Sequence, residues 1–326
     1  MHMAIKDRDA HFTASRAITQ SELAPEIRLQ CPRCSAKLLS LDCTKCGFGL
    51  WNEGGIIHAL PPARAEHYAE FICDYERIRA AEGRGSLSEQ FYVGLPFRDS
   101  SGKNSGQWRI RARTFRYLVE RVLKPGIRFG GRVLDLGAGN CWLSFRLALA
   151  GYRPIAVDLL TNKYDGLGAA QNYRGCLPAL FPRFQAELAH LPLQDEQADA
   201  AIFNASFHYS ESAGDAVREA LRCVRPGGLV IISDTPWYSS YESGRKMVTE
   251  RRRSFLARHG TASSSIESVE FLTDERLQSL EDELQIRWNA LSPRYGFLWS
   301  MRPLLAKIRG RREPASFRIY VARKAQ

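Results

Sequence analysis

Apolar residues recur along this chain with two periods, one typical of buried strands and one typical of helices. The stretch from Gly131 to Leu160 reads as a short strand, a glycine turn, an apolar helix face and a second strand that ends at Asp158. A short, nearly continuous apolar run bounded by turn residues fits a strand buried on both faces of a parallel sheet. A strand, a helix and a second strand in this order predict an α/β fold.

A helical period precedes this unit. The apolar residues that recur at three- and four-residue steps are Tyr68, Phe71, Ile72, Tyr75 and Ile78. Gly83 and Gly85 end this pattern, a loop rich in Gly and Ser follows, and a second amphipathic segment covers 108–122. Elements placed before the first strand of an α/β domain often cover its ligand crevice, so residues 63–106 are predicted to form a helical linker and lid. Plain packing against the body explains the pattern equally well.

Composition and charge narrow the class of protein. The 326 residues are 44% hydrophobic and 25% charged, as in a globular protein with one large domain and an accessory one. No stretch approaches the roughly 20 uncharged apolar residues of a membrane helix, and the polar start lacks the apolar segment of a secretory signal, so we expect a cytoplasmic protein. The net charge of +11 gathers late in the chain, at 243–260 and 292–318. It favours anionic partners such as RNA, acidic substrates or a membrane surface, although solubility alone accounts for it equally well.

Four of the eight cysteines form two C-x2-C pairs near the start of the chain. They are Cys31, Cys34, Cys43 and Cys46. Two tight turns of this kind direct backbone N–H groups at thiolate sulfurs, which suits a closed tetrahedral zinc site. Redox disulfides are the alternative, but the chain lacks a thioredoxin-like context.

The segment 29–62 resembles the small zinc-ribbon modules that precede some methyltransferases, including bacterial guanine methyltransferases that act on ribosomal RNA. In those modules a hydrophobic strand follows the cysteine turns, and GGIIHALPP (54–62) takes that place here. So small a module can hardly bury a core, so bound Zn²⁺ would supply much of its folding energy. We expect the ribbon either to contact the substrate or to brace the fold, and His58 to be a strand residue rather than a fifth ligand.

The turn after the first core strand is the candidate nucleotide site. Asp135 lies at the strand end, and Gly137 and Gly139 bracket a turn that allows the backbone to approach a ligand closely. Trp142 stands where a dinucleotide site needs its third glycine, so a pyrophosphate is a poor fit. About 20 residues further on, the carboxylate of Asp158 could accept hydrogen bonds from both hydroxyls of a ribose.

Residues 107–324 resemble the class I S-adenosylmethionine-dependent methyltransferases, those of type 11 in particular. VLDLGAGNCWLS (133–144) is similar to the first motif of that family. The later landmarks follow in the family's order: the acid after the second strand, QAELAHLPL (185–193), ADAAIFNASFHYS (198–210) and ALRCVRPGGLVIISD (220–234). The resemblance implies a seven-stranded, Rossmann-like, doubly wound sheet that binds S-adenosylmethionine, with its last two strands at 286–291 and 317–322.

The resemblance also implies where the cofactor lies. Asp158, with Leu159 beside it, would hold the ribose, and Glu187 with the backbone of Leu188 would meet the adenine edge. The family more often carries Asp at the position of Glu187, so that assignment is the softer one.

Other groups are placed for the methionine end of the cofactor. Asp135, Gly137 and Asn204 are expected to grip its amino and carboxyl groups. Asp165 either lines the same pocket or caps the next helix, and the sequence slightly favours the cap.

Methyl transfer from a sulfonium is an in-line displacement, so the enzyme mainly holds the nucleophile on the axis of the breaking bond in a dry site. A hydroxyl or amide acceptor also needs a base. His208, just past the fourth strand, is the first candidate, although a packing or substrate-orienting role fits it as well. Tyr209 and Asp234 are weaker candidates.

Three interpretations of the function stay open, and the sequence favours the first. The first acceptor is a small or medium-sized metabolite, anionic ones included, bound under the lid and beside the insertion between the last two strands. Its candidate contacts are Tyr75, Arg79, Tyr92, Arg294 and Tyr295. The second acceptor is RNA of the ribosomal kind, although NASFHY (204–209) replaces the Pro-Pro-aromatic motif of many enzymes that methylate exocyclic amines. The third interpretation is a non-catalytic, cofactor-binding partner subunit.

These patterns divide the chain into four parts. They are an N-terminal extension (1–28), a zinc ribbon (29–62), a helical linker or lid (63–106) and a Rossmann-like methyltransferase domain (107–326).

Overall fold

The computed structural model describes residues 27–326, so residues 1–26 of the predicted N-terminal extension lie outside the described part. The strands are β1 (Leu29–Gln30), β2 (Lys37–Leu38), β3 (Trp51–Glu53), β4 (Ile56–His58), β5 (Arg132–Leu136), β6 (Arg153–Asp158), β7 (Arg183–Gln185), β8 (Ala198–Asn204), β9 (Val224–Ser233), β10 (Asn289–Leu291) and β11 (Ile319–Arg323). The α-helices are α1 (Pro62–Ala81), α2 (Glu89–Gly94), α3 (Ser105–Leu118), α4 (Lys124–Gly126), α5 (Trp142–Leu149), α6 (Ala213–Cys223), α7 (Tyr241–His259), α8 (Asp274–Leu284), α9 (Phe297–Ser300) and α10 (Arg302–Ile308). A π-helical turn, η1 (Val119–Leu123), and two 3-10 segments, η2 (Leu167–Cys176) and η3 (Phe207–Tyr209), complete the set.

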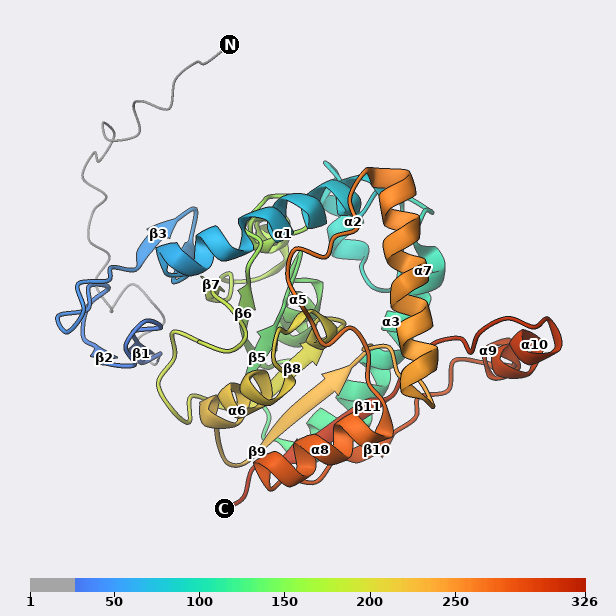
Figure 1. Cartoon of the computed structure of the whole chain (residues 1–326). Helices are drawn as coiled ribbons and strands as arrows, with labels where there is room; N and C mark the ends of the chain where they lie inside the picture. The colour runs from blue at the N-terminus through green and yellow to red at the C-terminus, as the bar shows by residue number, and fades with distance from the viewer. Residues whose placement is uncertain (1–26) are drawn as a thin grey trace, which may run out of the picture.

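One large sheet organises the molecule (Figure 1). Its strands follow the order β10-β11-β9-β8-β5-β6-β7-β4-β3. Strand β5 pairs in parallel with both β6 and β8. The connections therefore lead to opposite sides of β5, which makes β5 the point where the strand order reverses. In such sheets ligands bind at this point, outside the carboxyl ends of the strands.

The sheet is larger than the seven strands that the sequence predicts. The seven strands from β10 to β7 form the doubly wound core, and the ribbon adds β3 and β4 at its edge. Strand β4 pairs in parallel with β7, and His58 donates from Nδ1 to Oε1 of Gln185 at 2.5 Å. The added hairpin covers the free backbone groups that β7 would otherwise expose. His58 is thus a strand residue, as predicted.

The core lies on both faces of the sheet, as a doubly wound fold requires. Along β5, Val133 faces one layer and its neighbour Leu134 faces the other. Helices α6 and α8, together with the ribbon, pack on the face of Leu134, whereas α3 and α5 pack on the face of Val133. The four-cysteine segment 29–62 is therefore part of the main core and not a separate globule.

The first long helix confirms the helical period that precedes the sheet. Pro62 occupies the first turn of α1, where its missing N–H costs nothing, and Gly83 follows the last turn with φ +67°. Helix α7 packs beside α1 and supplies a second wall that the sequence did not predict (Figure 1). No helix among residues 27–326 is long and apolar enough to cross a bilayer.

The insertion between the last two strands does not lie against the lid. Strand β10 covers only part of the predicted range 286–291, and β11 begins two residues later than predicted. Between them α9 and α10 project away from the body (Figure 1).

Candidate active site

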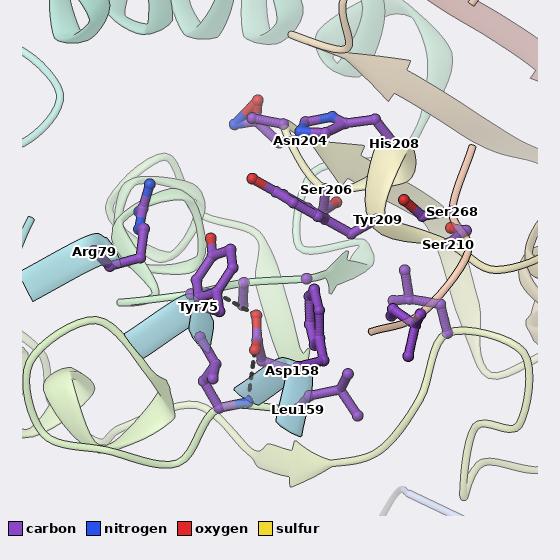
Figure 2. A pocket seen from close by; sticks show the side chains of 18 of the residues that line it. Tyr75, Arg79, Asp158, Leu159, Asn204, Ser206, His208, Tyr209, Ser210 and Ser268 are labelled. Carbon is purple, nitrogen blue, oxygen red and sulfur yellow. Dashed lines mark hydrogen bonds between the residues drawn. The ribbon is translucent and has the colours of Figure 1, made fainter. Parts of the chain in front are cut away.

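A cavity of about 780 Å³ lies at the carboxyl ends of β5, β6, β8 and β9. Helix α1 closes one side, and residues of α7 and the segment 263–270 close another. Figure 2 shows Asp158 and Leu159 on one side of this cavity, Asn204 and His208 on the opposite side, and Tyr75 and Tyr209 between them. The cavity is therefore the crevice that the strand order requires.

The glycine turn lets the backbone approach this cavity. Gly137 has φ +76°, and a Cβ on it would lie 2.2 Å from the Cβ of Ser206, so no other residue fits there. Gly139 donates its N–H to Oδ2 of Asp158 at 2.7 Å, and Leu160 donates to Oδ1 at 2.8 Å (Figure 2). The carboxylate thus ties the turn to the end of β6. Burial raises the pKa of Asp158 to about 6.

The far end of the cavity carries the residues predicted for adenine. Glu187 and Leu188 both line it. Glu187 is 4% exposed and accepts hydrogen bonds from Arg64 of the lid, at 2.9 Å from Nε and 2.7 Å from Nη2, and from the Tyr68 hydroxyl at 3.2 Å. Its longer side chain therefore fixes the start of α1 against the sheet as well as facing the cavity.

Two of the lid residues predicted for the substrate, Tyr75 and Arg79, line the cavity. Tyr75 packs edge-to-face on Tyr209, with ring centroids 5.4 Å apart. Arg79 forms an ion pair with Asp165, and both residues line the cavity. The sequence slightly favoured Asp165 as the cap of the next helix, but no side chain caps that helix. This ion pair joins α1 to the loop that follows β6.

His208 sits among positive charges. Burial first, and then the nearby Arg251, Arg111 and Arg79, lower the pKa of His208 to about 3. Its Nδ1 is buried and has no hydrogen-bond partner among the described residues. The imidazole is therefore neutral at physiological pH.

Arg111 is the cation of the cavity that lacks an acidic partner. Its guanidinium stacks 4.8 Å from the Trp108 ring and makes no ion pair or hydrogen bond within residues 27–326. Burial, together with Arg79 and Arg84, lowers its pKa to about 10. Arg84 pairs with Glu82, but its Nη1 is buried without a partner. This end of the cavity therefore carries unbalanced positive charge.

Asp234, at the end of β9, borders the same region. The Thr114 hydroxyl donates to its Oδ1 at 2.7 Å, and its Oδ2 is buried without a partner. Burial raises its pKa, whereas the hydrogen bond from Thr114 and the charge of Arg111 act in the opposite direction.

Four predicted site residues do not line the cavity. Asp135 is 1% exposed and accepts from the backbone N–H and the hydroxyl of Ser144, at 3.0 and 2.7 Å, so it holds the first turn of α5 instead of the cofactor. Tyr92 is fully buried, and its hydroxyl donates to backbone oxygens of the loops that it joins. Arg294 is exposed on the insertion, and Tyr295 lies behind Asp234, hydrogen-bonded to Thr114 at 2.8 Å.

Several lining residues escaped the sequence analysis. Arg251 and Glu270 form an ion pair with a closest distance of 2.5 Å on the wall that α7 supplies. Only long-range packing brings them here. The position of Arg111 could have been predicted from helical spacing. It stands three residues after Trp108 and four before Phe115, so it shares the buried face of α3.

The four paired cysteines form a second candidate site. Their Sγ atoms lie within 4.8 Å of one another, with 3.6 Å between Cys31 and Cys46 and 3.5 Å between Cys34 and Cys43. A tetrahedral site with Zn–S bonds of about 2.3 Å has S–S edges of about 3.8 Å, so the cluster fits zinc. Backbone N–H groups of Lys45 and Cys46 face the Cys43 sulfur, as the two tight turns predict.

Comparison with known proteins agrees with this geometry. Residues 134–232 match the protein family described as a methyltransferase domain. The solved structure of geranyl diphosphate methyltransferase in complex with GPP and sinefungin covers 80% of this chain and 100% of that chain, with a TM-score of 0.52 and 13% identity. The match thus identifies a methyltransferase domain within residues 134–232, on the sheet described above, and the solved structure shares its fold.

Several curated relatives are named as methyltransferases, but their names do not agree on one substrate. Malonyl-[acyl-carrier protein] O-methyltransferase from Yersinia pestis is 31% identical over 101 residues, 31% of this chain and 35% of the relative. An uncharacterized methyltransferase from Mycobacterium tuberculosis is 36% identical over 100 residues, 30% of this chain and 37% of the relative. Arsenite methyltransferase from Aquipseudomonas alcaligenes is 28% identical over 127 residues, 36% of this chain and 37% of the relative. The chain thus spans little more than a third of the length of these curated relatives.

Proposed function

We propose that this protein transfers the methyl group of S-adenosylmethionine to an oxygen or nitrogen of a small or medium-sized anionic metabolite. The observation that carries the proposal is the shape and charge of one cavity. One end is lined by the carboxylate of Asp158 and a glycine turn, and the other end contains the partly buried guanidinium of Arg111, which makes no ion pair within the described residues.

The residues at the first end fit the cofactor. Asp158 retains access to the cavity while its carboxylate is oriented by two backbone donors, so it can accept from the ribose hydroxyls. Leu159, Glu187 and Leu188 line the adenine end, and Gly137, Gly139 and Asn204 line the path to the methionine end. The bound cofactor supplies an electrophilic methyl group, and these residues orient it.

The residues at the second end fit a carboxylate or phosphate on the acceptor. A buried guanidinium is stabilised most by a planar or tetrahedral anion that accepts two of its hydrogen bonds. Arg111 provides such donors, Arg84 lines the cavity beside it, and Tyr75 provides an aromatic wall. Malonyl-[acyl-carrier protein] O-methyltransferase, arsenite methyltransferase and demethylmenaquinone methyltransferase are relatives named for non-nucleic-acid acceptors, which supports this class over RNA.

His208 is proposed to contact the acceptor atom. Because the imidazole is neutral well below pH 7, it accepts a hydrogen bond from a hydroxyl or amide and orients its lone pair toward the methyl group. Full proton transfer to His208 would place a new cation among arginines. The substrate anion offsets that cost, so proton acceptance and anion binding are coupled in this site. Tyr209 packs on His208, 4.3 Å between ring centroids, and holds the ring in place.

The four-cysteine cluster is proposed to bind Zn²⁺ in a structural role. The ribbon continues directly into the lid helix α1 and also extends the sheet beside β7, so its folding fixes two walls of the cavity. It carries no open coordination position that would suggest a catalytic metal.

The test is a turnover assay with the zinc-loaded protein, S-adenosylmethionine and a panel of carboxylated and phosphorylated small molecules. Formation of S-adenosylhomocysteine with at least one anionic acceptor, and not with bulk RNA, is the expected result. Turnover that requires RNA, with RNA affinity that falls steeply as salt rises, would replace the metabolite with RNA. Cofactor binding without turnover on any acceptor would indicate a non-catalytic subunit.

A further inference from the structure

The insertion between β10 and β11 forms an arm with no assigned role. We define the arm as residues 292–312, which include α9 and α10. Figure 1 shows both helices standing out beyond the rest of the fold. The base of the arm is held by Trp299, which stacks on Phe317 of the body at 5.7 Å and carries Arg302 at 3.8 Å over its ring. The arm is therefore anchored while its outer surface is free.

The outer surface of the arm is apolar to an unusual degree. Phe297 is 78% exposed, Leu298 81% and Ile308 72%. Leu304 and Leu305 add exposures of 50% and 39% within the same short segment. Single exposed apolar residues are ordinary on a protein surface, but a cluster of five on a projecting element marks an interaction site.

The same segment is strongly basic. Its cations are Arg294, Arg302, Lys307, Arg309, Arg311 and Arg312, and 292–312 contains no Asp or Glu. Arg312 pairs with Glu250 of α7, whereas Lys307, Arg309 and Arg311 make no ion pair within the described residues. The partner therefore has to accept both aliphatic side chains and unpaired positive charge.

One partner meets both requirements. Short amphipathic segments with Phe, Leu and Ile on one side and Lys and Arg on the other bind the interface of bilayers that contain anionic lipids. Nucleic acid would use the cations, but Leu and Ile offer neither stacking nor hydrogen bonds to it. A second copy of this chain would bring one cationic arm against another in a symmetric contact.

We propose that the arm docks on the surface of a membrane that contains anionic lipids, with Phe297, Leu298 and Ile308 inserted among the acyl chains and Lys307, Arg309 and Arg311 at the headgroups. This docking is independent of the acceptor proposed above. It concerns a surface that shares no residue with the cavity walls, apart from the anchoring contact of Trp299 with Phe317.

The test is co-sedimentation of the full-length, zinc-loaded protein with vesicles of phosphatidylcholine alone or mixed with phosphatidylglycerol. We expect binding to the mixed vesicles that weakens as NaCl rises and is far weaker on phosphatidylcholine alone. The double variant Phe297→Ser/Leu298→Ser should lose at least about tenfold in affinity, and the triple variant Lys307→Gln/Arg309→Gln/Arg311→Gln about 100-fold, because each cation contributes roughly a factor of five near such a surface.

A matched control removes apolar residues that are as exposed but lie elsewhere. Leu39 is 89% exposed and Leu87 87%, so Leu39→Ser/Leu87→Ser should bind vesicles like the wild type. Calorimetric binding of S-adenosylhomocysteine by every variant confirms that each one is folded. The proposal is overturned by wild-type protein that ignores the mixed vesicles, by equal losses in arm and control variants, by arm-dependent binding of bulk RNA in place of vesicles, or by a dimer that dissociates when the arm is changed.

Discussion

Replacing Arg111 with Met tests the charge balance of the cavity. Burial and the two neighbouring arginines lower the pKa of Arg111 from 12.5 to about 10. That difference corresponds to roughly 3 kcal/mol against the charged form, and water at the cavity mouth reduces it to about 1–2 kcal/mol. Met keeps most of the length and the packing on Trp108 but removes the charge. We therefore expect Arg111→Met to raise the free energy of unfolding of the ligand-free protein by about 1–2 kcal/mol.

The same change should weaken anion binding. A hydrogen bond to a charged group contributes about 1.5–3 kcal/mol, so affinity for an anion should fall by roughly 10- to 100-fold. The assay is thermal unfolding in saturating S-adenosylhomocysteine with increasing inorganic phosphate. Phosphate should raise the Tm of the wild type and leave the Tm of Arg111→Met almost unchanged.

Arg109→Met is the matched control, because Arg109 lies on the same helix but is exposed and outside the cavity. It should show neither the gain in stability nor the loss of the phosphate effect. The reasoning is refuted if Arg111→Met and Arg109→Met respond alike. It is also refuted if Arg111→Met weakens S-adenosylhomocysteine but not 5′-methylthioadenosine, since Arg111 would then hold the amino-acid end of the cofactor.

Three further predictions concern other parts of the site. Because the pKa of Asp158 is raised to about 6 and ribose hydroxyls need its ionised form, affinity for S-adenosylhomocysteine should fall by up to about tenfold for each pH unit below 6, and Asp158→Asn should bind weakly without this pH step. His208→Ala should retain cofactor affinity but lose about 100-fold or more in kcat, and unchanged turnover would remove His208 from the mechanism. The wild-type kcat should show no ionisation near pH 6.5, since His208 is neutral down to about pH 3. Cys43→Ser, or chelation of the metal, should lower the unfolding free energy by several kcal/mol and weaken cofactor binding through β4 and α1; a zinc content near zero in stable, active protein would contradict this.

Much of the fold could be predicted because it depends on local patterns. The strand, glycine turn and helix at 132–149 and the acid at Asp158 are local features, and each lies as expected. The nine-strand sheet could not be predicted in the same way. Strand β4 is three residues long, and nothing in GGIIHALPP states which free edge it joins. Only the exposed edge of β7 in the folded protein decides that.

The candidate site was predictable along the strands and less so elsewhere. Asp158 and Asn204 face the cavity because strand ends in a parallel sheet meet at one edge. Tyr92 is an aromatic residue of the predicted lid, but its hydroxyl forms hydrogen bonds with backbone oxygens in the core. The arginines of 292–312 are of a type that binds anionic substrates, yet the arm projects from the body (Figure 1) and none of its residues lines the cavity. Composition identifies a type of contact, and only tertiary packing determines where it occurs.

The central claim is that the cavity at the carboxyl ends of β5 and β6 holds an S-adenosyl nucleoside through Asp158. Calorimetric titration of the zinc-loaded protein with S-adenosylhomocysteine tests it most directly, with Asp158→Asn as the comparison. The account predicts one binding site per chain in the wild type and a loss of at least about tenfold in the variant, at unchanged circular dichroism. An absence of binding heat in the folded wild type, with S-adenosylmethionine as well, would contradict the account.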